Sequence, residues 1–269
     1  MAKTAVVADT ESGNKFVNLI RREIGQFLAL ASLVVIFGVF SILRPVFYSW
    51  QNVSAILMST TVTGMLALGV TFVIITGGID LSIGTSMTLC AVTIGKIVVV
   101  HKGPLWLGVI GGIAVGALVG AINGTLITAL KLPPFIVTLG TLNVFTALTL
   151  FYASGREIMG SELSPFMLSL GNNFKLGSFS FTYGALSMLV LYLILAYSLR
   201  FTAWGRHVYA TGDDIEASRL AGIRTDRVIL SVYAVAGLIF AFAGFVLIGR
   251  TQSASPNNGV DLNLDSITA

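Results

Sequence analysis

Charged residues are scarce in this sequence. Only 10% of its 269 residues are Asp, Glu, Lys or Arg, whereas about a quarter of a typical soluble domain is charged. At the same time 55% of the residues are hydrophobic and the mean hydropathy is +0.90. A water-soluble fold could not bury so much apolar surface, so the composition excludes an ordinary soluble domain.

The residues that enzymes use for chemistry are also few. The single cysteine, Cys90, excludes an internal disulfide. The two histidines, His101 and His207, do not form an H-E-x-x-H zinc motif. The chain contains neither G-x-S-x-G nor G-x-x-x-x-G-K-[ST], the usual serine-nucleophile and phosphate-loop motifs. We therefore expect no enzyme activity, no bound cofactor and no metal site in this chain.

The apolar residues that are present form continuous blocks. Each block is long enough to cross a hydrocarbon layer of roughly 30 Å as a helix. The sequence therefore predicts an all-α, polytopic membrane protein with about seven transmembrane helices, at 26–43, 53–76, 82–100, 105–130, 134–153, 181–199 and 228–249.

Basic residues indicate the orientation of these helices. The net charge of +4 is spread thinly and forms no dense run, which argues against nucleic-acid binding. If residues 1–25 form a cytoplasmic segment, ten of the sixteen Lys and Arg residues lie on the cytoplasmic side, as the positive-inside rule requires. We expect one membrane domain over 26–269, with a polar tail at 251–269 left outside.

Ionisable groups are rare inside the blocks, where only Lys96 occurs, and Asp80 is expected at an interface. Ion-coupled transporters usually place such groups within the bilayer, so this scarcity argues against one. Hydroxyls and amides could instead contact a neutral polyhydroxylated solute, although Ser and Thr are also common in packed membrane helices. The residues that we expect in a pathway or a gate are Asp80, Ser82, Asn123, Thr138, Thr141 and Asn143.

Two local patterns can be explained by helix structure and packing as well as by a function. Asp80 and Ser82 precede a block and could cap its helix, or take part in gating or solute contact. A second pattern repeats glycine every four residues along one helix face, which allows close helix packing or a sliding surface. These glycines are Gly108, Gly112, Gly116, Gly120 and Gly124.

The loop between the last two blocks contains a short helix. Aspartates open it and Gly222 ends it. Its small residues would suit docking into a partner's groove, although a solvated connector is equally compatible with them. The candidate docking residues are Asp214, Glu216, Ala217, Ser218, Arg219, Ala221 and Gly222.

Four motifs in order resemble one known family. They are Gly78–Gly84, Gly120–Gly124 with Leu132–Thr141, Glu216–Ile223, and the stretch from Gly249 to Ile267. The chain from about Asn52 onward thus resembles the permease subunits of ABC importers for ribose, xylose, galactose and related solutes.

The resemblance implies a type II importer-like fold in a bacterial inner membrane. Residues 214–223 would be the coupling helix that docks on a separate cytoplasmic ATPase, which hydrolyses the ATP. An extracytoplasmic solute-binding protein would deliver the solute, and a second permease copy would pair with this chain. Family members usually continue through about three more spans, so the resemblance also implies that C-terminal spans are missing here.

Two other classes remain open on sequence grounds. One is an ion-coupled secondary transporter, and the other is a non-transporting membrane assembly or enzyme subunit. Hydroxyl-rich helices do not distinguish a pentose from a hexose, so the solute itself is not predicted.

Overall fold

The computed structural model describes residues 28, 30–159, 163, 165–176, 179–259 and 262–269. The predicted cytoplasmic segment 1–25 lies outside them. The chain divides into two compact units, 1–53 and 54–269, which are described separately. The expected single membrane domain over 26–269 stays a prediction.

The first unit contains a short apolar helix, Leu30–Leu43. It covers most of the first predicted block, 26–43. A 3₁₀ helix, η1 (Pro45–Tyr48), follows it. The rings of Phe37 and Phe47 pack edge to face with centroids 5.0 Å apart, which ties the helix to the turn.

Among the residues that the structure describes, six helices are long and apolar enough to cross a membrane, and they match the other six predicted blocks. The prediction of a helical membrane protein is thereby confirmed. They are α2 (Trp50–Ile75), α3 (Ile83–Gly95) continued by the π-helical turn η2 (Lys96–Val100), α4 (Leu105–Ala129), α5 (Pro134–Ala153), α7 (Tyr183–Phe201) and α10 (Thr225–Thr251).

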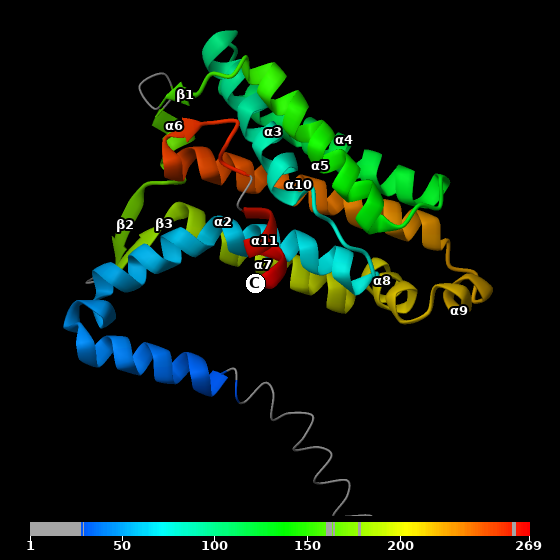
Figure 1. The fold of residues 1–269 in the computed structure, drawn as a ribbon, viewed down its shortest axis with the longest axis horizontal. Coiled ribbons are helices and arrows are strands. Elements are labelled where there is room, and N and C mark those ends of the chain that lie inside the picture. Colours follow the sequence, from blue (N-terminus) through cyan, green and yellow to red (C-terminus); the bar gives the residue numbers. More distant parts are fainter. Residues whose placement is uncertain (1–27, 29, 160–162, 164, 177–178, 260–261) are drawn as a thin grey trace, which may run out of the picture. The chain divides into compact units, whose positions relative to one another are not determined.

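Shorter elements connect these helices (Figure 1). Strands β1 (Ile158–Met159) and β4 (Ser253–Ala254) pair antiparallel, as do β2 (Asn173–Leu176) and β3 (Phe179–Thr182). The remaining elements are the helices α6 (Pro165–Ser169), α8 (Ala203–Asp213), α9 (Ile215–Leu220) and α11 (Leu262–Thr268).

The helix ends follow local sequence signals. Pro134 occupies the first turn of α5, where its missing N–H costs nothing. Thr182 caps α7 by accepting the Ala185 N–H at 3.1 Å. Thr202 caps α8 through Gly205 N–H at 3.1 Å. The Thr202 cap separates α7 from α8 without a long loop.

Helix α10 forms the centre of the second unit. It packs most extensively against α4 and then against α3, and Tyr233 and Phe240 are among the largest buried side chains. By contrast, α4, α5 and α7 leave much of their apolar surface exposed. That surface is suited to lipid or to another membrane chain.

The C-terminal segment does not stay outside the bundle, so the prediction of a free polar tail at 251–269 is wrong. After α10, β4 pairs with β1, and Gly259 lies against the backbone of Gly84. The helix α11 then packs on α3. A polar segment can enter the bundle because its groups find partners there, as Asn263 does with the Gly84 N–H.

Candidate functional site

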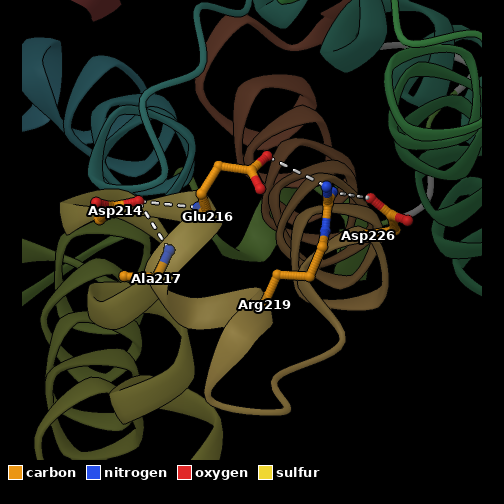
Figure 2. A network of polar contacts seen from close by, with 5 residues as sticks. All are labelled: Asp214, Glu216, Ala217, Arg219 and Asp226. Carbon is orange, nitrogen blue, oxygen red and sulfur yellow. Dashed lines mark hydrogen bonds and ion pairs between the residues drawn. The ribbon is translucent and has the colours of Figure 1, made fainter.

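The short helix α9 has well-defined ends. Asp214 is its N-cap, and its Oδ1 accepts the N–H groups of Glu216 and Ala217, each at 2.9 Å (Figure 2). At the other end Gly222 has φ +87°, and the Ile223 N–H donates to the Ser218 carbonyl at 3.0 Å. The predicted helix is therefore present, with Asp214 and Gly222 at its two ends.

Helix α9 is fixed to the rest of the unit by charge as well as by caps. The Arg219 guanidinium lies 3.3 Å from Glu216 within α9 and 3.5 Å from Asp226 in the first turn of α10 (Figure 2). All three side chains are half exposed or more, so each pair adds at most about 1 kcal/mol of stability. Their main effect is to orient α9 against α10.

Most of α9 is exposed. Ser218 is buried, whereas Leu220 is 90% exposed and Ile215 is 39% exposed. Ala217, Ala221 and the charged residues also lie on the surface. A helix whose small residues surround a fully exposed leucine offers a partner an apolar contact with little steric obstruction.

An open groove runs beside the end of α9. Its walls come from α8, from the turn after α9 and from the start of α10. Trp204 Nε1 donates to Ser231 Oγ at 2.8 Å and so joins α8 to α10 in the wall of this groove. The lining residues are Trp204, His207, Ala221, Gly222, Ile223, Arg224, Arg227, Val228 and Ser231.

Helix α8 also touches the end of α2. A Cβ built on Gly212 would meet the carbonyl oxygen of Ile75, and Phe72 stacks on Trp204 with centroids 5.5 Å apart. Because α8 contacts both α2 and α10, a displacement of α9 would be transmitted to two transmembrane helices.

Five of the six expected pathway residues lie close together. Asn123 Nδ2 donates to Ser82 Oγ at 2.9 Å, and Asn123 Oδ1 accepts from Thr141 Oγ1 at 2.7 Å. Thr138 Oγ1 donates to the Ile79 carbonyl at 3.1 Å, and Ser82 also bonds Asp80. All five side chains are at most 7% exposed. They form a buried polar network between α3, α4 and α5, and their expected place in a pathway or a gate stays a prediction.

Asn143 is not part of this network. It is exposed on α5, and its Nδ2 donates to the Leu139 carbonyl of the same helix at 2.9 Å. The sequence pattern does not separate it from Thr141, because both lie on one apolar helix and differ only in the face they occupy.

The expected cap at Asp80 differs from the observed one. Ser82 is the N-cap residue of α3, and its side chain accepts no helical N–H. Asp80 Oδ1 instead accepts from Ser82 N at 2.8 Å and Ser82 Oγ at 2.7 Å, a local turn typical of aspartate. Asp80 also lies inside the bundle rather than at its expected interface, because Ser82 bonds Asn123, the nineteenth of 25 residues in α4.

The glycine stripe of α4 packs as predicted, but against two partners. Gly108 and Gly112 face Val98 and Ile94 of the α3–η2 helix. Gly116, Gly120 and Gly124 face the backbone of α10 at Gly237, Tyr233 and Leu230. Nothing in the structure tests the alternative of a sliding surface.

Comparison with known proteins assigns this architecture to a family. Residues 52–269 match the family described as "Branched-chain amino acid transport system / permease component". The chain belongs to this family. No solved structure matches the chain significantly.

Curated relatives of this permease family are similar over most of the chain. The chain is 43% identical to the fructose import permease FrcC of Rhizobium meliloti, over 90% of this chain and 68% of that protein. It is 38% identical to the ribose import permease RbsC of Bacillus subtilis, over 93% and 76%. It is 34% identical to the autoinducer 2 import permease LsrC of Enterobacter sp. strain 638, over 92% and 70%.

Three residues of this permease chain take positions that the sequence patterns did not predict. Asn263 reaches α3, the hydroxyl of Tyr233 is buried and has no hydrogen-bond partner among the described residues, and Asp265 lies exposed on α11. The missed signal for the first and third was the motif ending at Ile267, which the count of seven spans from a cytoplasmic N-terminus had placed outside the membrane.

Proposed function

We propose that this chain is the membrane-spanning permease subunit of an ATP-binding cassette importer that carries a small neutral sugar-like solute into the cell. It would lie in the bacterial inner membrane with its N-terminus in the cytoplasm. The observation that carries the proposal is the exposed, capped helix α9, found in a chain of the permease family. Relatives named as fructose and ribose import permeases support the solute class.

In this function the energy comes from a neighbour. Among the described residues no group of three or more His, Cys, Asp and Glu side chains could hold a metal ion, and the sequence has no phosphate loop. A separate cytoplasmic ATPase would therefore dock on α9, with Leu220 and Ile215 as apolar contacts and the basic groove at Arg224 and Arg227 beside them. Acidic side chains of the ATPase would complement that groove.

The mechanical path follows from the contacts of α8. When the ATPase displaces α9, the Trp204–Ser231 bond and the Gly212–Ile75 contact carry the motion to α10 and α2. Both helices are packed as rigid elements, so the expected response is a switch between two discrete arrangements. A solute-binding protein outside would supply the solute, and a second permease copy would complete the pathway.

Cross-linking tests the docking assignment. Leu220→Cys is made in the full chain and treated with a bifunctional thiol reagent in cells that also produce a candidate ABC ATPase and a solute-binding protein. The matched control is Phe166→Cys, an apolar residue that is 62% exposed at the other end of the bundle. The native Cys90 is buried and gives little background.

We expect the ATPase to be captured from position 220 and not from position 166. Uptake of D-fructose and D-ribose in the same cells should require ATP and should fall at least about tenfold with Leu220→Asp. If neither capture nor ATP-dependent uptake occurs, or if an ion gradient alone drives uptake, the proposed function is wrong.

A further inference from the structure

The connection between α2 and α3 is irregular. Helix α2 ends in a Schellman turn, in which Gly77 has φ +75° and the Gly78 N–H donates to the Val73 carbonyl at 2.9 Å. The five residues 78–82 that follow have no regular secondary structure. Figure 1 shows this connection, in cyan, running from the end of α2 beside α8 to α3. Irregular backbone within a membrane bundle is tolerated where protein covers it, so its contacts decide what it can do.

Four helices contact this connection. Helices α4 and α5 hold it through the hydrogen bonds of the buried polar network. On α10, Tyr233 lies against Gly78, where a Cβ would meet the tyrosine oxygen at 2.8 Å. At the start of the connection, Gly212 of α8 lies against Ile75. The 78–82 connection therefore joins the α8–α9 region to three transmembrane helices.

Buried hydroxyls without partners occur on two helices of this junction. Among the described residues, four buried side-chain atoms have no hydrogen-bond partner, and three of them are hydroxyls of α8 and of the first nine residues of α10. They belong to Thr211, Thr225 and Tyr233, whose side chains are at most 2% exposed. Buried polar groups are nearly always hydrogen-bonded, so three exceptions at one junction require an explanation.

Asp80 offers the acceptor that Tyr233 lacks. Within the described part of the chain it is the one buried acidic side chain, and neither ion pair there involves it. Its hydrogen bonds from the Ser82 N–H and hydroxyl both go to Oδ1, so Oδ2 can accept another. The electrostatic field of this carboxyl reaches the Tyr233 hydroxyl. A shift of the 78–82 connection is therefore enough to bring the two groups together.

From these contacts we propose that Tyr233 is a positioning residue that holds the second arrangement of the importer. When the ATPase moves α8 against α2, the 78–82 connection shifts and the Tyr233 hydroxyl donates to Asp80 Oδ2. The inference rests on the proposed function and identifies a polar contact that distinguishes its two arrangements. The unpartnered hydroxyl raises the free energy of the arrangement described here, so the new hydrogen bond narrows the free-energy gap between the two.

Thermal unfolding in detergent, without an ATPase, tests the first half of this proposal. Tyr233→Phe removes only the hydroxyl, which has no partner among the described residues, so its Tm should equal or exceed that of the parent. The matched control is Tyr192→Phe on α7, whose hydroxyl donates to the Gly64 carbonyl at 3.3 Å. A Tm lowered by Tyr233→Phe would show that the hydroxyl is already bonded, for example to a buried water, and would overturn the proposal.

Uptake of D-fructose and D-ribose by the same variants tests the second half. We expect Tyr233→Phe to lower the maximal rate at least about tenfold, as the loss of one buried hydrogen bond can. The sugar concentration for half-maximal uptake should not change, because the hydroxyl contacts Asp80 and not the solute. The amount of chain in the membrane, cross-linking at position 220 and uptake by Tyr192→Phe should match the parent. Uptake by Tyr233→Phe at the parent's rate would overturn the proposal.

A double variant tests whether Tyr233 acts through Asp80. Asp80→Asn replaces Oδ2 with an amide nitrogen, which cannot accept the tyrosine proton. We expect this variant to lower the maximal rate, and the double variant to transport no more slowly than the slower single variant. Losses that multiply would show independent roles and would overturn the proposal. A parent chain without ATP-dependent uptake would refute the importer assignment itself, whereas an active parent with an equally active Tyr233→Phe refutes this inference alone.

Discussion

The side-chain oxygen of Asn263 accepts the backbone N–H of Gly84 at 2.6 Å, which joins two segments that are 179 residues apart. The Gly84 N–H belongs to the first turn of α3, where helical N–H groups have no partner within the helix. Asn263 thus caps from a distance a helix that its own N-cap residue, Ser82, leaves uncapped.

Replacing Asn263 with leucine should therefore destabilise the bundle. The Gly84 N–H would be buried without a partner, which costs about 1–3 kcal/mol. Thermal unfolding in detergent should show a lower Tm for Asn263→Leu. Asn263→Asp keeps an acceptor oxygen near a helix N-terminus, so its Tm should stay close to that of the parent. Equal Tm values for Asn263→Leu and the parent would show that the bond contributes nothing.

The buried network predicts how strongly substitutions at Asp80 and at Asn123 change the stability of the bundle. Asp80→Asn keeps the Oδ1 acceptor for Ser82 and removes an ionisable group from the interior, so stability should be equal or higher. Asn123→Leu leaves Ser82 and Thr141 without their shared partner and should cost about 2 kcal/mol or more. The two Tm values check this order, and the reverse order would contradict the buried geometry.

Close backbone packing makes Gly120 intolerant of a side chain. A Cβ there would meet the Tyr233 carbonyl oxygen, so Gly120→Val should force α4 and α10 apart at a cost of about 1–3 kcal/mol or more. Gly140→Val is the control, because nothing lies within 4 Å of the Cβ position at Gly140. Size-exclusion profiles and Tm should change for the first variant alone.

Coupling should depend on the backbone of Gly222. Its φ of +87° is accessible to glycine and strained for residues with a Cβ, while the space around its Cβ position is open. Gly222→Val should therefore misdirect the end of α9 and uncouple ATP hydrolysis from uptake. Gly155→Val is the control, because Gly155 also has a positive φ, +66°, and open space around its Cβ position but lies away from α9. Unchanged uptake by Gly222→Val would refute the docking assignment.

The sequence predicted the elements of the fold better than the positions of polar groups in depth. Continuous apolar blocks, the Pro133–Pro134 break and the glycine stripe depend on neighbours along one helix, so each is visible locally. The short helix α9 was predicted for the same reason, because Asp214 and Gly222 act on their own chain segment.

Placement within the membrane was harder to predict, for a physical reason. Charges are assumed to mark interfaces, and that assumption put Asp80 at the membrane interface. The count of seven spans from a cytoplasmic N-terminus put the 251–269 segment outside. In the structure both enter the bundle because distant partners compensate them, as Ser82, Asn123 and Asn263 do. The exposed face of Asn143 similarly depends on which neighbours surround α5, which its own sequence does not encode.

Leu220, 90% exposed at the tip of α9, also bears on how the chain is handled in the cell. In the proposed importer this leucine stays an apolar group in water, next to an accessible loop, until the ATPase docks, and chaperones and proteases act on such features. A copy synthesised in excess of its ATPase should therefore be cleared faster than an assembled one, so that the abundance of the two subunits is matched after translation.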